Sequence, residues 1–177
     1  MISAASALKP ALLIVAGSGN SETGRGRSIS SLVTMMVDFF FGGSSPLTPL
    51  KALPGAPAWV AGVLDYEGAS VPVIDIAARA LARSSQERLS TRLALVTYPR
   101  DGEDGVTTHH RLGLLLEQAT RTVTFDATSF TDAGIDTPHA RYLGPLTRDD
   151  AGLLQWVRIE HLLPEDVQAL LFAGSEA

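Results

Sequence analysis

A glycine-rich run near the N-terminus, Gly17–Gly24, is the part of the sequence that most suggests chemistry. It reads Gly-Ser-Gly-Asn-Ser-Glu-Thr-Gly and follows Ala11–Ala16, an apolar stretch that predicts a strand. Such loops hold phosphate groups with backbone amides at a helix N-terminus. Gly17 and Gly19 fit the first two positions of the dinucleotide fingerprint, but Glu22 occupies the third and would face a pyrophosphate. A flexible hairpin loop is favoured, and a nucleotide- or phosphate-binding enzyme using this loop stays as the alternative.

The four histidines do not form a convergent set of metal ligands. His109 and His110 are adjacent, so in an extended chain they point to opposite faces. The preceding segment Arg100–Thr108 is polar and contains glycine, which predicts a solvated loop, and His139 and His161 have no obvious partners. Zinc sites need three or four convergent ligands, and the chain has no cysteine. The sequence therefore predicts no metal site and no cofactor.

Three carboxylates near predicted strand ends are the remaining candidates for acid–base work. A pair drawn from Asp65, Glu67 and Asp75 could transfer protons, but turn capping or partner contact explains the same positions. The Gly-x-Ser-x-Gly context of a hydrolase nucleophile is missing around Ser18, Ser28 and Ser90. No catalytic residues are predicted, and the chain is expected not to be an enzyme.

Length and composition further restrict which classes of protein and of partner fit this chain. The 177 residues are 45% hydrophobic, which predicts one compact domain with a real core, with two lobes as an option. A net charge of −5 argues against nucleic acid as a partner. The apolar stretches Ala11–Ala16 and Leu32–Phe41 are shorter than the roughly 20 residues of a spanning helix, so no direct membrane insertion is expected. No secretory signal is recognised, and a cytoplasmic location is predicted.

Short apolar segments separated by turn residues predict an all-β fold. The predicted strands are Pro57–Tyr66, Ala69–Ile76, Thr91–Tyr98, Leu112–Glu117, Thr120–Phe125 and Leu153–Ile159. Breaks such as Glu67-Gly68 favour hairpins between neighbouring strands. Helices are predicted only at Ala77–Ser84 and at Pro164–Phe172, where proline and two acidic residues suit a helix N-terminus.

The segment from Ala56 to Ile76 resembles the CheW-like family, the adaptor module of bacterial chemosensory arrays. It reads Ala-Pro-Ala-Trp-Val-Ala-Gly-Val-Leu-Asp-Tyr-Glu-Gly-Ala-Ser-Val-Pro-Val-Ile-Asp-Ile. The ordered positions that match the family pattern are Pro57, Gly62, Val63, Gly68, Pro72 and Asp75. The resemblance continues through Arg111–Glu117, Tyr142–Gly144 and Leu153–Leu163. Residues 46–172 are thus identified as a CheW-like domain with two lobes, preceded by a divergent segment, 1–45, that supplies the first strands and followed by a tail, 173–177.

The resemblance implies both a fold and a function. The implied fold is two small five-stranded barrels that share a core, with a groove between them and short helices that include a C-terminal one. The implied function is to couple chemoreceptors to a CheA-type histidine kinase by binding the kinase regulatory domain and the cytoplasmic tip of a methyl-accepting chemoreceptor, without catalysis. The implied location is the inner face of the membrane, in receptor arrays. A degenerate family member that serves only as an interaction platform stays as an alternative.

The resemblance also suggests partner-binding residues. They are Asp65, Tyr66 and Glu67 at a turn, and Arg92, Leu112, Gly113 and Leu114 on strands of the second lobe. The family turn is often Asn-Leu-Arg-Gly, so a carboxylate, Glu67, stands where an arginine is common, and a different cognate partner is expected. Core packing is the alternative role for the apolar residues, and a solvated hairpin is the alternative for the turn. An exposed strand edge in the divergent N-terminal segment would allow a homo-oligomer.

Overall fold

The computed structural model describes residues 11–15, 32–33, 38–39, 49–102, 105–117, 119, 125–132, 134, 138–149 and 152–173. The chain divides into two compact units. The first unit comprises residues 1–35 and 123–162, and the second comprises residues 36–122 and 163–177. The Gly17–Gly24 loop, most of the Leu32–Phe41 stretch and all of the predicted strand Thr120–Phe125 except Phe125 lie outside the described residues.

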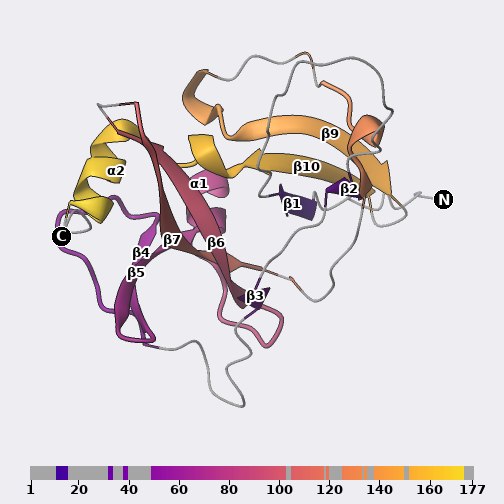
Figure 1. Cartoon of the computed structure of the whole chain (residues 1–177). Coiled ribbons are helices and arrows are strands. Elements are labelled where there is room, and N and C mark those ends of the chain that lie inside the picture. Colours follow the sequence, from indigo (N-terminus) through magenta and orange to yellow (C-terminus); the bar gives the residue numbers. More distant parts are fainter. Residues whose placement is uncertain are drawn as a thin grey trace. The chain divides into compact units, whose positions relative to one another are not determined.

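A five-stranded sheet forms the body of the second unit (Figure 1). Its strand order is β3 (Asp38–Phe39), β6 (Arg92–Asp101), β7 (Thr107–Leu116), β5 (Ala69–Asp75) and β4 (Val60–Tyr66). The central strand β7 runs antiparallel to β6 and parallel to β5. A parallel pair needs a long crossover, and here α1 (Ile76–Leu81) and the whole of β6 lie between β5 and β7 in the chain.

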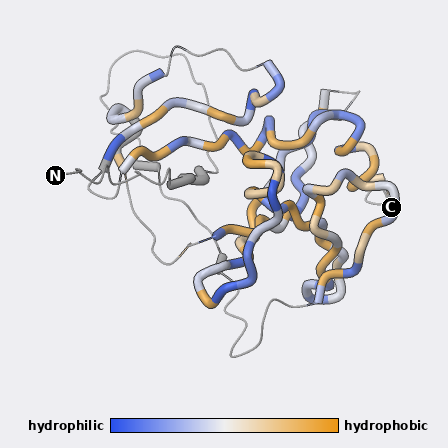
Figure 2. Tube along the Cα trace, turned by 180° about the vertical axis from the view of Figure 1, so that it is seen from behind, coloured by the Kyte–Doolittle hydropathy of each residue, from blue (hydrophilic) through white to orange (hydrophobic). Residues whose placement is uncertain are grey.

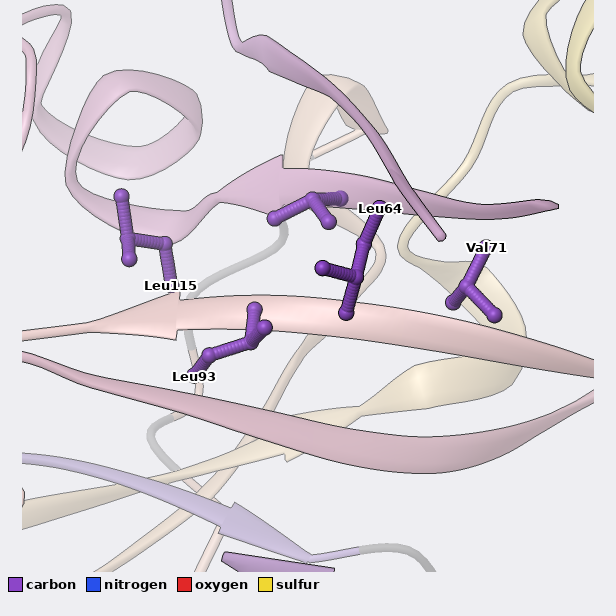
Figure 3. Packing of buried hydrophobic residues seen from close by; sticks show 5 residues of the cluster. Leu64, Val71, Leu93 and Leu115 are labelled. Atoms are coloured by element: carbon purple, nitrogen blue, oxygen red, sulfur yellow. The ribbon is translucent and has the colours of Figure 1, made fainter. Parts of the chain in front are cut away.

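Successive strand residues point to opposite faces of the sheet, and each face carries buried apolar side chains. On one face a cluster of apolar side chains is buried, which we call the β4–β7 cluster (Figure 3): Leu64, Val71, Val73, Leu93 and Leu115. The other face buries Val96, Tyr98, Leu112 and Leu114. There the ring of Phe172, from the C-terminal helix α2 (Glu165–Phe172), stacks on Tyr98 with 5.6 Å between centroids. The predicted C-terminal helix is confirmed, and it packs on the body of the unit.

Asp75 makes the transition from β5 to α1. Its Oδ1 accepts a hydrogen bond from the amide of Ala78 at 3.0 Å, which is the geometry of a helix N-cap. The same carboxylate accepts the amide of Ser85 at 2.7 Å and the Ser85 hydroxyl at 2.6 Å. Asp75 is buried, and these bonds are partly shielded from water. Of the roles that the sequence leaves open for Asp75, which are acid–base work, capping and partner contact, the structure shows capping.

The first unit holds two small sheets. One has the order β1 (Ala11–Val15), β10 (Gly152–Arg158) and β9 (Leu143–Asp149), with β1 parallel to β10. The other pairs β2 (Leu32–Val33) with β8 (Phe125–Asp126). Strand β9 is not among the predicted strands, because Gly144, Pro145 and its polar C-terminal residues read as a turn. The proline is tolerated because β9 lies at the edge of its sheet.

The predicted all-β class is confirmed, since strands dominate both units and the helices are short. Closure of the sheets into barrels stays a prediction. No helix within the described residues has the length and apolar character needed to cross a membrane.

Candidate protein-interaction site

The turn between β4 and β5 is a tight hairpin. Tyr66 pairs with Ala69, so Glu67 and Gly68 alone form the loop, with φ angles of 54° and 80°. Positive φ at both positions is the pattern of a type I′ turn, which follows the twist of the strands. The Asp65 Oδ1 accepts the amide of Gly68 at 3.1 Å and fixes the turn. The predicted hairpin is therefore present, and it holds Asp65 and Glu67 exposed to solvent.

Arg111 of β7 contacts this turn across the sheet. Its Nη1 lies 3.5 Å from the Glu67 Oε2, and its guanidinium carbon lies 5.4 Å from the centroid of the Tyr66 ring. The Arg111 and Glu67 side chains are 58% and 69% exposed, so this ion pair contributes only about 0–1 kcal/mol to stability. Arg111 is absent from the predicted site, because its proximity depends on the parallel register of β5 and β7, which local sequence patterns do not reveal.

The three predicted contacts on β7 lie in the interior. Leu112 and Leu114 are fully buried, and Gly113 packs against the β4–β7 cluster. A methyl group added to Gly113 would lie 2.9 Å from the Val73 Cγ2 and 3.2 Å from the Leu93 Cδ1, which leaves no room for a side chain. Contact of these residues with a partner stays a prediction, and their observed role is to fill the two faces of the sheet.

Arg92 lies at the other end of the same sheet. Arg92 is the first residue of β6 and pairs with Leu116 of β7, whereas Arg111 of β7 pairs with Thr97 of β6. Arg111 and Leu116 are five positions apart on β7, which is about 17 Å along a strand. The guanidinium of Arg92 donates to the carbonyls of Leu89 and Thr91. The structure therefore separates the predicted residues into a turn group, a buried group and Arg92, and it does not gather them at one point.

The connection from α1 to β6 is rich in polar and charged residues, leads into Arg92 and is fixed by Glu117. Figure 2 shows the hydropathy of the described residues along the chain. The Arg83 Nη1 and Nη2 donate to the two carboxylate oxygens of Glu117 at 2.8 and 2.7 Å, and the amide of Gln86 donates to its Oε1 at 2.7 Å. The hydrogen bond from Arg83 is the main reason why the pKa of Glu117 is lowered to about 2, although partial burial opposes the shift.

This lowered pKa predicts an acid-dependent loss of stability. In the unfolded chain the pKa of glutamate is about 4.3, so the carboxylate of Glu117 contributes stability above that pH. The contribution is lost as the pH falls toward 2, because the folded protein must then take up a proton. We expect the free energy of unfolding, measured in urea at pH 5 and pH 3, to fall more in the wild type than in Glu117→Gln. The exposed-loop variant Glu87→Gln should keep the wild-type difference, and an unchanged difference in Glu117→Gln would contradict the prediction.

The predicted solvated loop at Arg100–Thr108 is shorter than expected, although its described residues are exposed or half-buried. β6 continues to Asp101 and β7 begins at Thr107, so both adjacent histidines are strand residues. They do point to opposite faces: His109 is exposed, while the ring of His110 stacks on Phe172 with 4.4 Å between centroids. Burial, together with the charge of Arg100, lowers the pKa of His110. Within the described part of the chain, no three histidine or acidic side chains gather where they could hold a metal.

An exposed charged turn, supported by a rigid sheet, is suited to contact with another protein rather than to bond-making chemistry. The described fold and site thus define a β-rich scaffold class of protein. The chain matches the family model described as the CheW-like domain over residues 44–167, and it belongs to the CheW-like family. Members of this family are non-enzymatic chemotaxis scaffolds, so the predicted family, scaffold role and non-enzymatic character are confirmed, and the nucleotide-binding alternative is set aside.

The solved structures include a similar protein. It is the scaffolding protein TtCheW from Thermoanaerobacter tengcongensis, which is 16% identical in sequence with a TM-score of 0.55. The match covers 67% of this chain and 72% of that chain. At this level of identity the likeness shows the fold. No curated protein sequence matches the chain.

Proposed function

We propose that this protein couples a CheA-type histidine kinase to chemoreceptors by binding the kinase regulatory domain and the cytoplasmic tip of a methyl-accepting receptor. It would work in the cytoplasm, at the inner face of the membrane, within receptor arrays. Membership of the CheW-like family carries the proposal. The exposed turn of Asp65, Tyr66 and Glu67 is the proposed contact, because its backbone is fixed while its carboxylates face solvent.

Arg92 is proposed as a second contact on the same unit. Next to it, the side chain of Leu89 is 96% exposed, although the flanking loop is held by Asp75 and Glu117. An ordered loop that exposes a large apolar side chain loses little conformational entropy when a partner covers it. Leu112, Gly113 and Leu114 would support both contacts from the interior by fixing the strand between them. Self-association through the N-terminal segment stays a further prediction.

The test is a titration of the full chain against the regulatory domain of the histidine kinase encoded beside it. We expect micromolar binding, weakened about tenfold or more in Glu67→Arg, because reversal of a charge at a fixed contact creates repulsion in place of attraction. Glu165→Lys is the matched control, since Glu165 is exposed on α2, which packs on the opposite face of the sheet. It should bind as the wild type does.

The result that overturns the proposal is equally definite. If neither the wild type nor the variant binds the kinase domain or the receptor tip, the chain has the family fold without the coupling function. The degenerate interaction platform would then be the correct description. Binding that is equally strong in the wild type and in Glu67→Arg would keep the coupling function and remove the turn from the contact.

A further inference from the structure

Two exposed side chains of opposite charge, Glu67 and Arg111, lie close together on the second unit. Glu67 stands on the β4–β5 turn, and Arg111 and His109 follow each other at alternate positions of β7, so both point to the same face of the sheet. Arg111 bridges the two strands through its contacts with Glu67 and the Tyr66 ring. We call Tyr66, Glu67, Arg111 and His109 the dipolar strip.

The parts of the strip are held in place by their surroundings, while the ion pair between Arg111 and Glu67 is long and exposed. Tyr66 packs against the β4–β7 cluster, which fixes the ring beneath the guanidinium of Arg111. The backbone of Arg111 is paired with Thr97 in the middle of the sheet, and the turn that carries Glu67 is fixed by Asp65. The exposed ion pair itself contributes little stability, so a partner can replace it at small cost.

Arginine and tyrosine, with tryptophan, are enriched among the residues that contribute most to affinity in protein interfaces. The planar guanidinium of Arg111 presents several donors and can bind a carboxylate with two parallel hydrogen bonds. Glu67 at 3.5 Å makes only one long contact with it, which leaves other donors available to a second carboxylate. A partner that brings a cation to Glu67 and a carboxylate to Arg111 would pair with both groups. A partner with these two charges exchanged would be repelled by Glu67 and by Arg111.

We propose that the dipolar strip recognises a protein segment of complementary charge order, with a carboxylate opposite Arg111 and a cation opposite Glu67, and that Arg111 is a specificity-determining residue for this partner. The inference rests on the proposed coupling function and deepens it.

A charge-swap cycle tests the inference. The wild type, Glu67→Arg, Arg111→Glu and the double variant are each titrated against the kinase regulatory domain and against the receptor tip, and each is unfolded in urea. The double variant keeps an ion pair within the protein but exchanges the two signs. We expect each single variant to weaken binding to one of these partners by about tenfold or more. The double variant should unfold like the wild type and still bind that partner at least tenfold more weakly.

The outcomes separate the inference from the proposed function. If the double variant regains wild-type affinity, the partner does not distinguish the two arrangements of the charges on residues 67 and 111. The inference is then wrong. The inference is also wrong if the wild type binds while all three variants bind equally well, although coupling would then stand. If the wild type binds neither partner, the inference and the proposed coupling function are both wrong. Arg148→Glu, an exposed charge reversal on β9 in the first unit, is the control and should leave both affinities unchanged.

Discussion

Substituting Asp75 with alanine should lower the free energy of unfolding by about 3 kcal/mol. The substitution removes a helix cap, which costs about 1 kcal/mol, together with hydrogen bonds to a charged acceptor that contribute about 1.5–3 kcal/mol. It also leaves the amide of Ser85 without its acceptor beside a buried position. Urea unfolding of the full chain, followed by circular dichroism, measures the difference.

Two variants make this measurement specific. Asp75→Asn keeps an oxygen that can accept the amide of Ala78, so it should cost less than alanine does. Asp65→Ala is the matched control, because Asp65 also accepts one backbone amide at a strand end but is exposed. It should cost less than about 1 kcal/mol, in the range of exposed positions. A cost for Asp75→Ala no larger than that of Asp65→Ala would contradict the structural role given to Asp75.

Enlarging Gly113 should destabilise the fold by about 1–2 kcal/mol for alanine and by more for valine. Alanine is favoured over glycine in a strand by about 0.5–1 kcal/mol, but overpacking in a core costs about 1–3 kcal/mol. Overpacking prevails here because the nearest atom, the Val73 Cγ2, belongs to a stiff and fully buried side chain at 2.9 Å. Urea unfolding of Gly113→Ala and Gly113→Val provides the two values.

A double-mutant cycle identifies the cause of this loss. Val73→Ala removes the Cγ2 atom that a methyl group on residue 113 would meet. The double variant Gly113→Ala with Val73→Ala should therefore cost about 1 kcal/mol less than the two single changes added together. Strict additivity would mean that crowding against Val73 is not the cause. The predicted partner contact at Gly113 would gain support instead if Gly113→Ala kept its stability and lost binding to the kinase domain.

Local sequence patterns were sufficient for the strands with continuous apolar character and clear turns. β4, β5, β6 and β10 lie where alternation and β-branched residues predict them, and the Glu67-Gly68 turn follows from residues that favour a tight hairpin. Patterns failed where strand residues are polar. β9 and the distal ends of β6 and β7 read as loops, because their pairing comes from neighbouring strands rather than from their own composition.

The sequence by itself determined the family, the all-β class and the position of the exposed turn, since each depends on residues close together in the chain. Only the tertiary structure decided which residues share a surface. The parallel register of β5 and β7 brings Arg111 to Glu67 and Tyr66, and the same register buries Leu112, Gly113 and Leu114 and leaves Arg92 at the far end of the sheet. Strand register is set by packing between segments distant in sequence, and a shift of one residue would turn every one of these side chains to the opposite face.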